Sequence, residues 1–205
     1  MKLYLSSYKF GDHVDQLLDM ISNPKTAYIN NALDCYPDIQ ARQESDEKNL
    51  WELKEIWLDP TIVDLRDFFG KKDTLEKELS QYGCLWVRWG NTFVLRKAMQ
   101  LSGFDQLIPQ LVARKDLVYG GYSAGVVLLG DTLRWLDLVD EPHVIPYDDQ
   151  ITVREGLGLL HYTIIPHYRS DHPEAADVEK TIEYCIEHKI PFKALRDEEV
   201  IISEV

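Results

Sequence analysis

A serine flanked by glycines is the clearest candidate for chemistry in this sequence. Residues 121–125 read Gly-Tyr-Ser-Ala-Gly, a G-x-S-x-G motif that follows the apolar stretch 117–120 and precedes the apolar, helix-compatible stretch 124–129. A nucleophile elbow needs this order of strand, sharp turn and helix, because it presents the serine hydroxyl at a helix N-terminus. Short Gly/Ser patterns also arise where a strand simply ends tightly, but the context favours Ser123 as a nucleophile.

A serine nucleophile needs a general base, and six histidines compete for that role. His167 follows an apolar stretch and Pro166, at the kind of strand end where functional side chains of open α/β sheets gather. We interpret three others as surface residues: His13, His143 and His188. A zinc site could be sought at His161, His167 and His172. Their spacing matches no standard zinc pattern, so we predict no metal site and assign His167 as the base.

The acid that would orient this histidine is not decided by spacing. The candidates between the serine and the histidine are Asp137, Asp140, Asp148 and Asp149. The candidates after the histidine are Asp197, Glu198 and Glu199. An acid between the two is typical of an α/β-hydrolase, and an acid after the histidine indicates a different fold. With 35 acidic residues in the chain, most of them are expected to be solvated surface groups.

An alternating framework of strands and helices must bring these residues together. The predicted strands of the first part of the chain are 2–8, 25–32, 61–69, 84–90 and 117–123. The predicted helices are 13–21, 38–58, 74–82, 93–110 and 124–129. Short strands, a helix over 174–188 and a final pair of strands at 192–196 and 200–204 follow. This alternation predicts an α/β three-layer sandwich with a mainly parallel central sheet, formed as one domain over residues 1–205.

Composition excludes several classes of function. The 205 residues include 22 Lys and Arg against 35 Asp and Glu, a formal net charge of −13, so a role in binding nucleic acid or a membrane surface is not expected. No apolar run is long enough for a membrane span or a signal peptide, which favours a cytoplasmic protein. The three cysteines, Cys35, Cys84 and Cys185, are interpreted as reduced thiols, with Cys84 a packed core residue.

Three ordered stretches resemble a known family. Residues 89–95 resemble its GGNTF.L turn, residues 121–125 resemble its GxSAG elbow, and residues 156–168 resemble its GL…PHF/Y segment. The family is that of dipeptidase E, the aspartyl dipeptidases, with cyanophycinase as a more distant relative and a fold similar to class I glutamine amidotransferases. The resemblance runs from the first strand to the ALRDEEVII ending.

The resemblance implies a serine peptidase acting on dipeptides or small peptides without a cofactor. It implies Ser123 as nucleophile, His167 as general base and an oxyanion hole formed by the backbone amides of Gly90 and Ala124. The family's late carboxylate falls nearest Asp197, where relatives often carry Glu. An earlier aspartate corresponds to Asp137, and we favour Asp197 because a turn between two strands can hold it rigidly.

Two departures from the family pattern bear on the substrate. Trp89 replaces a glycine of the oxyanion turn, which would narrow or reshape the cleft. The segment after the histidine lacks the arginines that pair with an acidic substrate, leaving Arg169 as the nearby basic candidate, with Arg88 or Arg96 close to the Gly90 turn. Strict specificity for N-terminal Asp is therefore not expected.

Two other functions remain open from the sequence. One is a small α/β-hydrolase esterase with Asp137 or Asp140 as its acid, and the other is a non-catalytic binding protein on the same scaffold with Trp89 filling the cleft. The partner expected for the peptidase is a small peptide substrate. The sequence leaves a homodimer open.

Overall fold

A six-stranded sheet forms the centre of the molecule. The computed structural model describes residues 1–171 and 175–205, so His172 lies outside the described residues. The strand order is β3-β2-β4-β5-β1-β8. The strands are β1 (Lys2–Ser6), β2 (Lys25–Ile29), β3 (Asp59–Ile62), β4 (Cys84–Val87), β5 (Val118–Tyr122) and β8 (Val200–Glu204). All pairings are parallel except that of β1 with β8, which confirms the mainly parallel sheet.

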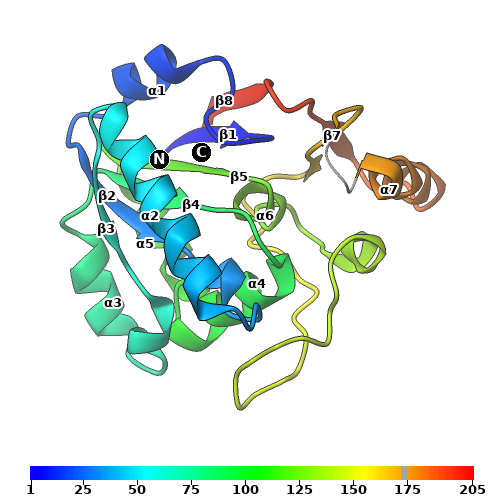
Figure 1. The fold of residues 1–205 in the computed structure, drawn as a ribbon, viewed down its shortest axis with the longest axis horizontal. Helices are drawn as coiled ribbons and strands as arrows, with labels where there is room; N and C mark the ends of the chain where they lie inside the picture. Colours follow the sequence, from blue (N-terminus) through cyan, green and yellow to red (C-terminus); the bar gives the residue numbers. More distant parts are fainter. Residues whose placement is uncertain (172–174) are drawn as a thin grey trace.

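Alternating strand residues build a core on each face of the sheet. The helices are α1 (Val14–Met20), α2 (Ile39–Glu55), α3 (Lys72–Leu79), α4 (Thr92–Ser102), α5 (Ile108–Ala113), α6 (Ala124–Val127) and α7 (Ala175–Glu187). Leu3 and Leu5 of β1 pack with α3, α4, α5 and α6, whereas Tyr4 packs with Leu17 of α1 and Leu53 of α2 on the other face. Figure 1 shows α2 crossing one face of the sheet. This is the predicted three-layer arrangement.

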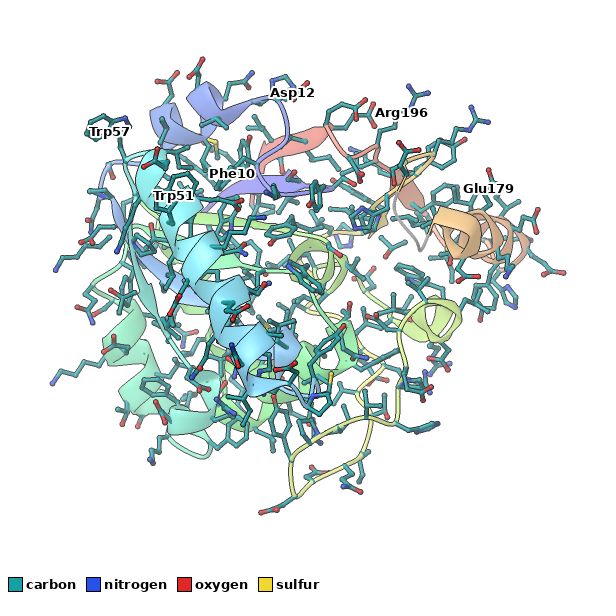
Figure 2. All side chains as sticks on the ribbon, in the orientation of Figure 1. Phe10, Asp12, Trp51, Trp57, Glu179 and Arg196 are labelled. Atoms are coloured by element: carbon teal, nitrogen blue, oxygen red, sulfur yellow. The ribbon has the colours of Figure 1, made fainter. Side chains whose placement is uncertain are left out.

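The surface helix α2 begins at a well-formed cap. Asp38 precedes it, and its side chain accepts a hydrogen bond from the Ala41 amide. Only one of its residues, Leu53, is fully buried, so the helix is attached to the sheet by few apolar contacts. Figure 2 shows Trp51 and Trp57 at the surface around the end of this helix, with side chains that are 59% and 83% exposed.

The C-terminal part departs from the regular alternation. Strands β6 (Thr163–Ile165) and β7 (Phe192–Ala194) form a separate parallel pair, next to which α7 lies (Figure 1). The two strands predicted at the end of the sequence are present as β7 and β8, but they lie in different sheets, because β8 joins β1 in the central sheet. Between α6 and β6 the described chain contains only short 3-10 structure at Arg134–Leu138 and one bridge, Thr132 with Glu155.

Two further predictions require correction. The strand expected over 61–69 ends at Ile62, and a 3-10 turn follows at Leu65–Phe68, whose start is capped by Asp64. The helix expected over 93–110 is divided, because Gly103 adopts φ 78° and ends α4 in the left-handed conformation. Short 3-10 structure then leads into α5.

The ends of the described chain are tied together. The Met1 ammonium donates hydrogen bonds to the carbonyls of Val112 and Val205, at 2.9 and 3.0 Å. Figure 1 shows both ends beside β1. Within the described residues, no helix is both long and apolar enough to cross a membrane.

Candidate active site

Ser123 lies on a strained turn between β5 and α6. Its backbone adopts φ 51° and ψ −122°, a conformation that non-glycine residues rarely adopt and that costs of order 1–3 kcal/mol. The two motif glycines let this turn pack against β4. A Cβ atom at Gly121 would lie 2.4 Å from the Val87 carbonyl oxygen, and one at Gly125 would lie 2.1 Å from it. The sequence-predicted elbow therefore depends on close backbone approach to a neighbouring strand.

The turn between β4 and α4 brings a second backbone amide beside the serine. Gly90 adopts φ 139°, and a Cβ atom there would lie 2.6 Å from the Ala32 carbonyl oxygen. Asn91 caps α4, its side-chain oxygen accepting from the Val94 amide at 3.0 Å. Among the described residues, the amides of Gly90 and Ala124 donate to no protein acceptor. Both residues line a cavity with Ser123, so their amides are available to a ligand oxygen there.

His167 is a buried histidine held both at its ring and at its backbone amide. The residue follows β6 in the chain, its backbone adopts φ 61°, and it is 2% exposed. Nδ1 lies 2.7 Å from Oδ1 of Asp197, and the backbone amide donates to Oγ of Ser7 at 2.8 Å. A carboxylate at Nδ1 keeps the proton of the neutral ring there and makes Nε2 the basic nitrogen. His167 lines the same cavities as Ser123.

Asp197 reaches His167 from the loop between β7 and β8. Leu195 of this loop is buried, Arg196 is exposed at the surface (Figure 2), and the Asp197 side chain is 30% exposed. Burial of Leu195 anchors the loop while its neighbour faces solvent. The sequence therefore pointed to the acid that the structure places beside the histidine.

Ser7 is a component of this arrangement that the sequence analysis missed. It follows β1 at the carboxyl edge of the sheet and is completely buried. Its hydroxyl lies 3.2 Å from the Leu195 carbonyl oxygen and 3.4 Å from Oδ1 of Asp197, while it accepts the His167 amide. Ser7 thus joins the segments that carry the histidine and the acid. Its place directly after a buried strand was the signal that could have identified it.

The other candidate acids have different partners. Asp137 pairs with Arg154, and Asp149 pairs with Lys97 at 2.6 Å. Oδ2 of Asp140 accepts from the Thr92 amide at 2.7 Å, at the start of α4. The remaining candidates are exposed residues: Asp148, Glu198 and Glu199. In the described residues, Asp197 is the carboxylate that an ion-pair contact joins to Nδ1 of His167.

Two cavities of different size meet at the serine. Ser123, His167 and Gly90 line both. The smaller has a volume of about 30 Å³ and apolar walls that include Trp135 and Val178. The larger has a volume of about 280 Å³. Its other lining residues are Tyr8, Lys9, Tyr36, Lys48, Asn49, Glu52, Trp89 and Tyr122.

The predicted cationic residues do not line these cavities. Arg169 is exposed, and its guanidinium lies 5.1 Å from the ring centroid of its neighbour Tyr168. Arg88 is completely buried and pairs with Asp46 at 2.6 Å. Arg96 pairs with Asp105 at 3.0 Å. The structure therefore leaves the expected positive groups outside the cavities.

The other described histidines and the cysteines line neither of the two cavities. Four histidines are exposed: His13, His143, His161 and His188. Within residues 1–171 and 175–205, no group of three His, Cys, Asp or Glu side chains is placed to hold a metal ion. Burial raises the pKa of the Cys84 thiol to about 12, as expected for a packed core residue.

Comparison with known proteins assigns the chain to a family. A model of peptidase family S51 matches residues 6–204. The chain belongs to this family. It is 28% identical over 109 residues to an uncharacterized peptidase of Listeria innocua, covering 53% of this chain and 50% of the relative, so the aligned part spans half of that relative. It is 25% identical over 172 residues to an uncharacterized peptidase of Pasteurella multocida, covering 82% of this chain and 77% of the relative.

Solved structures of low sequence identity show the same fold. A crystal structure provisionally described as a peptidase E protein from Listeria monocytogenes has a TM-score of 0.74 at 20% identity, covering 100% of this chain and 98% of that one. A peptidase from an acI-B1 Actinobacterium has a TM-score of 0.67 at 10% identity, covering 99% and 83%. The predicted family and fold class are confirmed, and membership of family S51 supports a serine peptidase of the peptidase E type.

Proposed function

We propose that this chain is a serine peptidase that hydrolyses dipeptides or small peptides with Ser123, His167 and Asp197 as its triad. The observation that carries the proposal is the 2.7 Å contact between Nδ1 of His167 and Oδ1 of Asp197, beside a cavity shared with the elbow serine. A buried imidazole oriented by a carboxylate is the arrangement that activates a serine hydroxyl. Membership of family S51 agrees with this chemistry.

The proposed reaction has two halves. Oγ of Ser123 attacks the scissile carbonyl while Nε2 of His167 takes the hydroxyl proton. His167 then gives that proton to the leaving amine, which departs and leaves an acyl-enzyme. Water activated by the same histidine hydrolyses the ester and regenerates the serine. The Asp197 carboxylate keeps the imidazole in the required tautomer and stabilises the imidazolium that forms in each half.

The amides of Gly90 and Ala124 would stabilise the oxyanion. Gly90 lies in the turn between β4 and α4, Ala124 directly follows the serine at the start of α6, and neither amide donates to another group in the described residues. Each donor is fixed by its backbone rather than by a mobile side chain. Removing one such donor typically lowers the rate on the order of 10²- to 10³-fold.

The proposal is tested by replacing the nucleophile. We expect Ser123→Ala to retain its fold, measured by circular dichroism, and to lose turnover of a dipeptide panel by at least about 10⁴-fold, because no other hydroxyl replaces the attacking atom. The exposed Ser80, whose hydroxyl donates to the Lys77 carbonyl, provides a matched control as Ser80→Ala. A fluorophosphonate probe should label the wild type and the Ser80 variant only. Equal turnover by the wild type and Ser123→Ala would contradict the proposal.

A further inference from the structure

The two cavities beside Ser123 differ in the size of group they can hold. The smaller, at about 30 Å³, has room for a group of the size of a water molecule or a methyl group. The larger, at about 280 Å³, exceeds the roughly 150 Å³ that accommodates a benzene ring in a protein core. A peptide bond placed at the serine therefore has a small residue on one side and a bulky residue on the other.

The walls of the larger cavity are aromatic. Tyr8 and Tyr122 form an edge-to-face pair with ring centroids 6.2 Å apart, and Tyr36 and Trp89 form a second pair at 6.3 Å. Three of these rings are 36–42% exposed: Tyr8, Tyr36 and Trp89. Exposed rings gathered around one cavity gain most from contact with another flat apolar group.

Buried contacts hold the Trp89 ring in place behind this cavity. The guanidinium of Arg88 lies 5.0 Å from the Trp89 ring centroid, and its two terminal nitrogens donate to Asp46 and Ser45 of α2. Trp89 is therefore backed by a fixed cation and edged by Tyr36. The tryptophan that replaces a family glycine forms a wall of the larger cavity rather than closing the site.

The charges at the two cavities have opposite signs. In the larger one, Lys9 pairs with Glu52 at 2.6 Å, while Lys48 is exposed and has no carboxylate partner among the described residues. Asp140, whose Oδ2 accepts from the Thr92 amide, is the acidic residue among those that line the smaller one. An ammonium group is favoured near Asp140 and a carboxylate near Lys48. These are the two ends of a dipeptide, and they set its direction across Ser123.

We infer that the preferred substrates are dipeptides with a small N-terminal residue and an aromatic C-terminal residue whose free carboxylate lies near Lys48. The inference rests on the proposed peptidase function and names its substrate class. The aromatic side chain would lie among Tyr8, Trp89 and Tyr122 in the larger cavity. Ala-Phe and Gly-Tyr represent this class, whereas Phe-Ala and Asp-Ala do not.

Binding to an inactive variant tests this class independently of turnover. Titration calorimetry of Ser123→Ala should show Ala-Phe binding at least about tenfold more tightly than Phe-Ala, Asp-Ala or the amide of Ala-Phe. Phe-Ala presents its large side chain to the small cavity, and Asp-Ala places a carboxylate beside Asp140. The amide of Ala-Phe lacks the carboxylate charge that Lys48 attracts. Equal or tighter binding of Phe-Ala or Asp-Ala would overturn the inference.

Substituting two lysines of α2 in turn distinguishes a local effect of the Lys48 charge from a general effect of the protein's net charge. In the Ser123→Ala background, Lys48→Gln should reduce the preference for Ala-Phe over its amide about three- to tenfold, because the attracting charge is lost at an exposed position. Lys54→Gln removes the same charge from an exposed position of α2 that lines neither cavity, and the preference should not change. Equal changes in both variants would overturn the role of Lys48.

Measuring peptide cleavage by the wild type shows whether this inference or the proposed function itself has failed. Wild-type protein should cleave Ala-Phe with a kcat/KM at least about tenfold above that for Phe-Ala. Cleavage with the reverse preference overturns the substrate class and leaves the serine mechanism intact. Cleavage of no peptide contradicts the proposed function, while the calorimetric order still decides the cavity assignment.

Discussion

The segment that carries Ser123 and the segments that carry His167 and Asp197 are built differently. The serine follows a central strand whose neighbours on both sides are parallel and fully paired, and its turn is packed directly against β4. The histidine and the acid lie in loops beside the two-stranded pair of β6 and β7, joined through Ser7. Close backbone packing positions the proposed nucleophile, whereas hydrogen bonds between distant segments position the proposed base.

The two regions should therefore respond differently to substitution. A group held by backbone packing cannot move without disturbing the sheet, so damage there lowers stability and activity together. A group held by side-chain hydrogen bonds can lose its orientation while the rest of the fold persists. Substitutions in the two regions should therefore separate loss of activity from loss of folding.

In the region held by hydrogen bonds, the largest effect is expected at Asp197. Asp197→Asn removes the charge beside Nδ1 of His167 and favours the wrong ring tautomer, so kcat should fall about 10³- to 10⁴-fold with little change in the urea midpoint. Asp137→Asn is the matched control, because Asp137 pairs with Arg154 away from the histidine. Steady-state kinetics of both variants checks this. A comparable loss in Asp137→Asn would contradict the assignment of the acid.

Substitution of a glycine in the turn that carries Ser123 should disrupt the region held by backbone packing. Gly125→Ala places a Cβ atom 2.1 Å from the Val87 carbonyl oxygen, and we expect the free energy of unfolding to fall by about 3 kcal/mol, together with activity. Gly70→Ala has open space around the new atom but retains φ 69°, so a loss of about 1 kcal/mol is expected without loss of kcat. Urea titration of both variants compares the stability cost of steric overlap with the cost of backbone strain alone. Equal stability losses would show that packing against β4 is not decisive.

A smaller effect is expected at the hydroxyl that joins the loops. Ser7→Ala leaves the buried His167 amide without its acceptor, and kcat should fall about tenfold with a stability loss of about 1–2 kcal/mol. Ser102→Ala removes another fully buried hydroxyl, which bonds the Met99 carbonyl in α4, and should lower stability without affecting kcat. Kinetics and urea titration of the pair check the distinction. If both variants lose stability equally and neither loses activity, Ser7 has only a structural role.

Much of the central sheet could be predicted from the sequence. The apolar runs of β1, β4 and β5 are buried on both faces, so they appear as short hydrophobic stretches. Serine follows two of them directly, Ser7 after β1 and Ser123 after β5. The C-terminal pairing could not be predicted, because β7 and β8 are short, half-buried strands whose partners depend on contacts far away in the chain. Their sequences contain no signal that assigns them to different sheets.

The family, the alternating fold and the candidate serine and histidine could all be predicted from the sequence. These depend on local patterns: glycines that permit a sharp turn, strand-length apolar runs, and motifs in a fixed order. The folded structure was needed to show which carboxylate meets the histidine, that Ser7 joins their segments, and that Trp89 and Lys48 border one cavity. Those relations join residues far apart in the chain, and spacing along the sequence carries no measure of such distances.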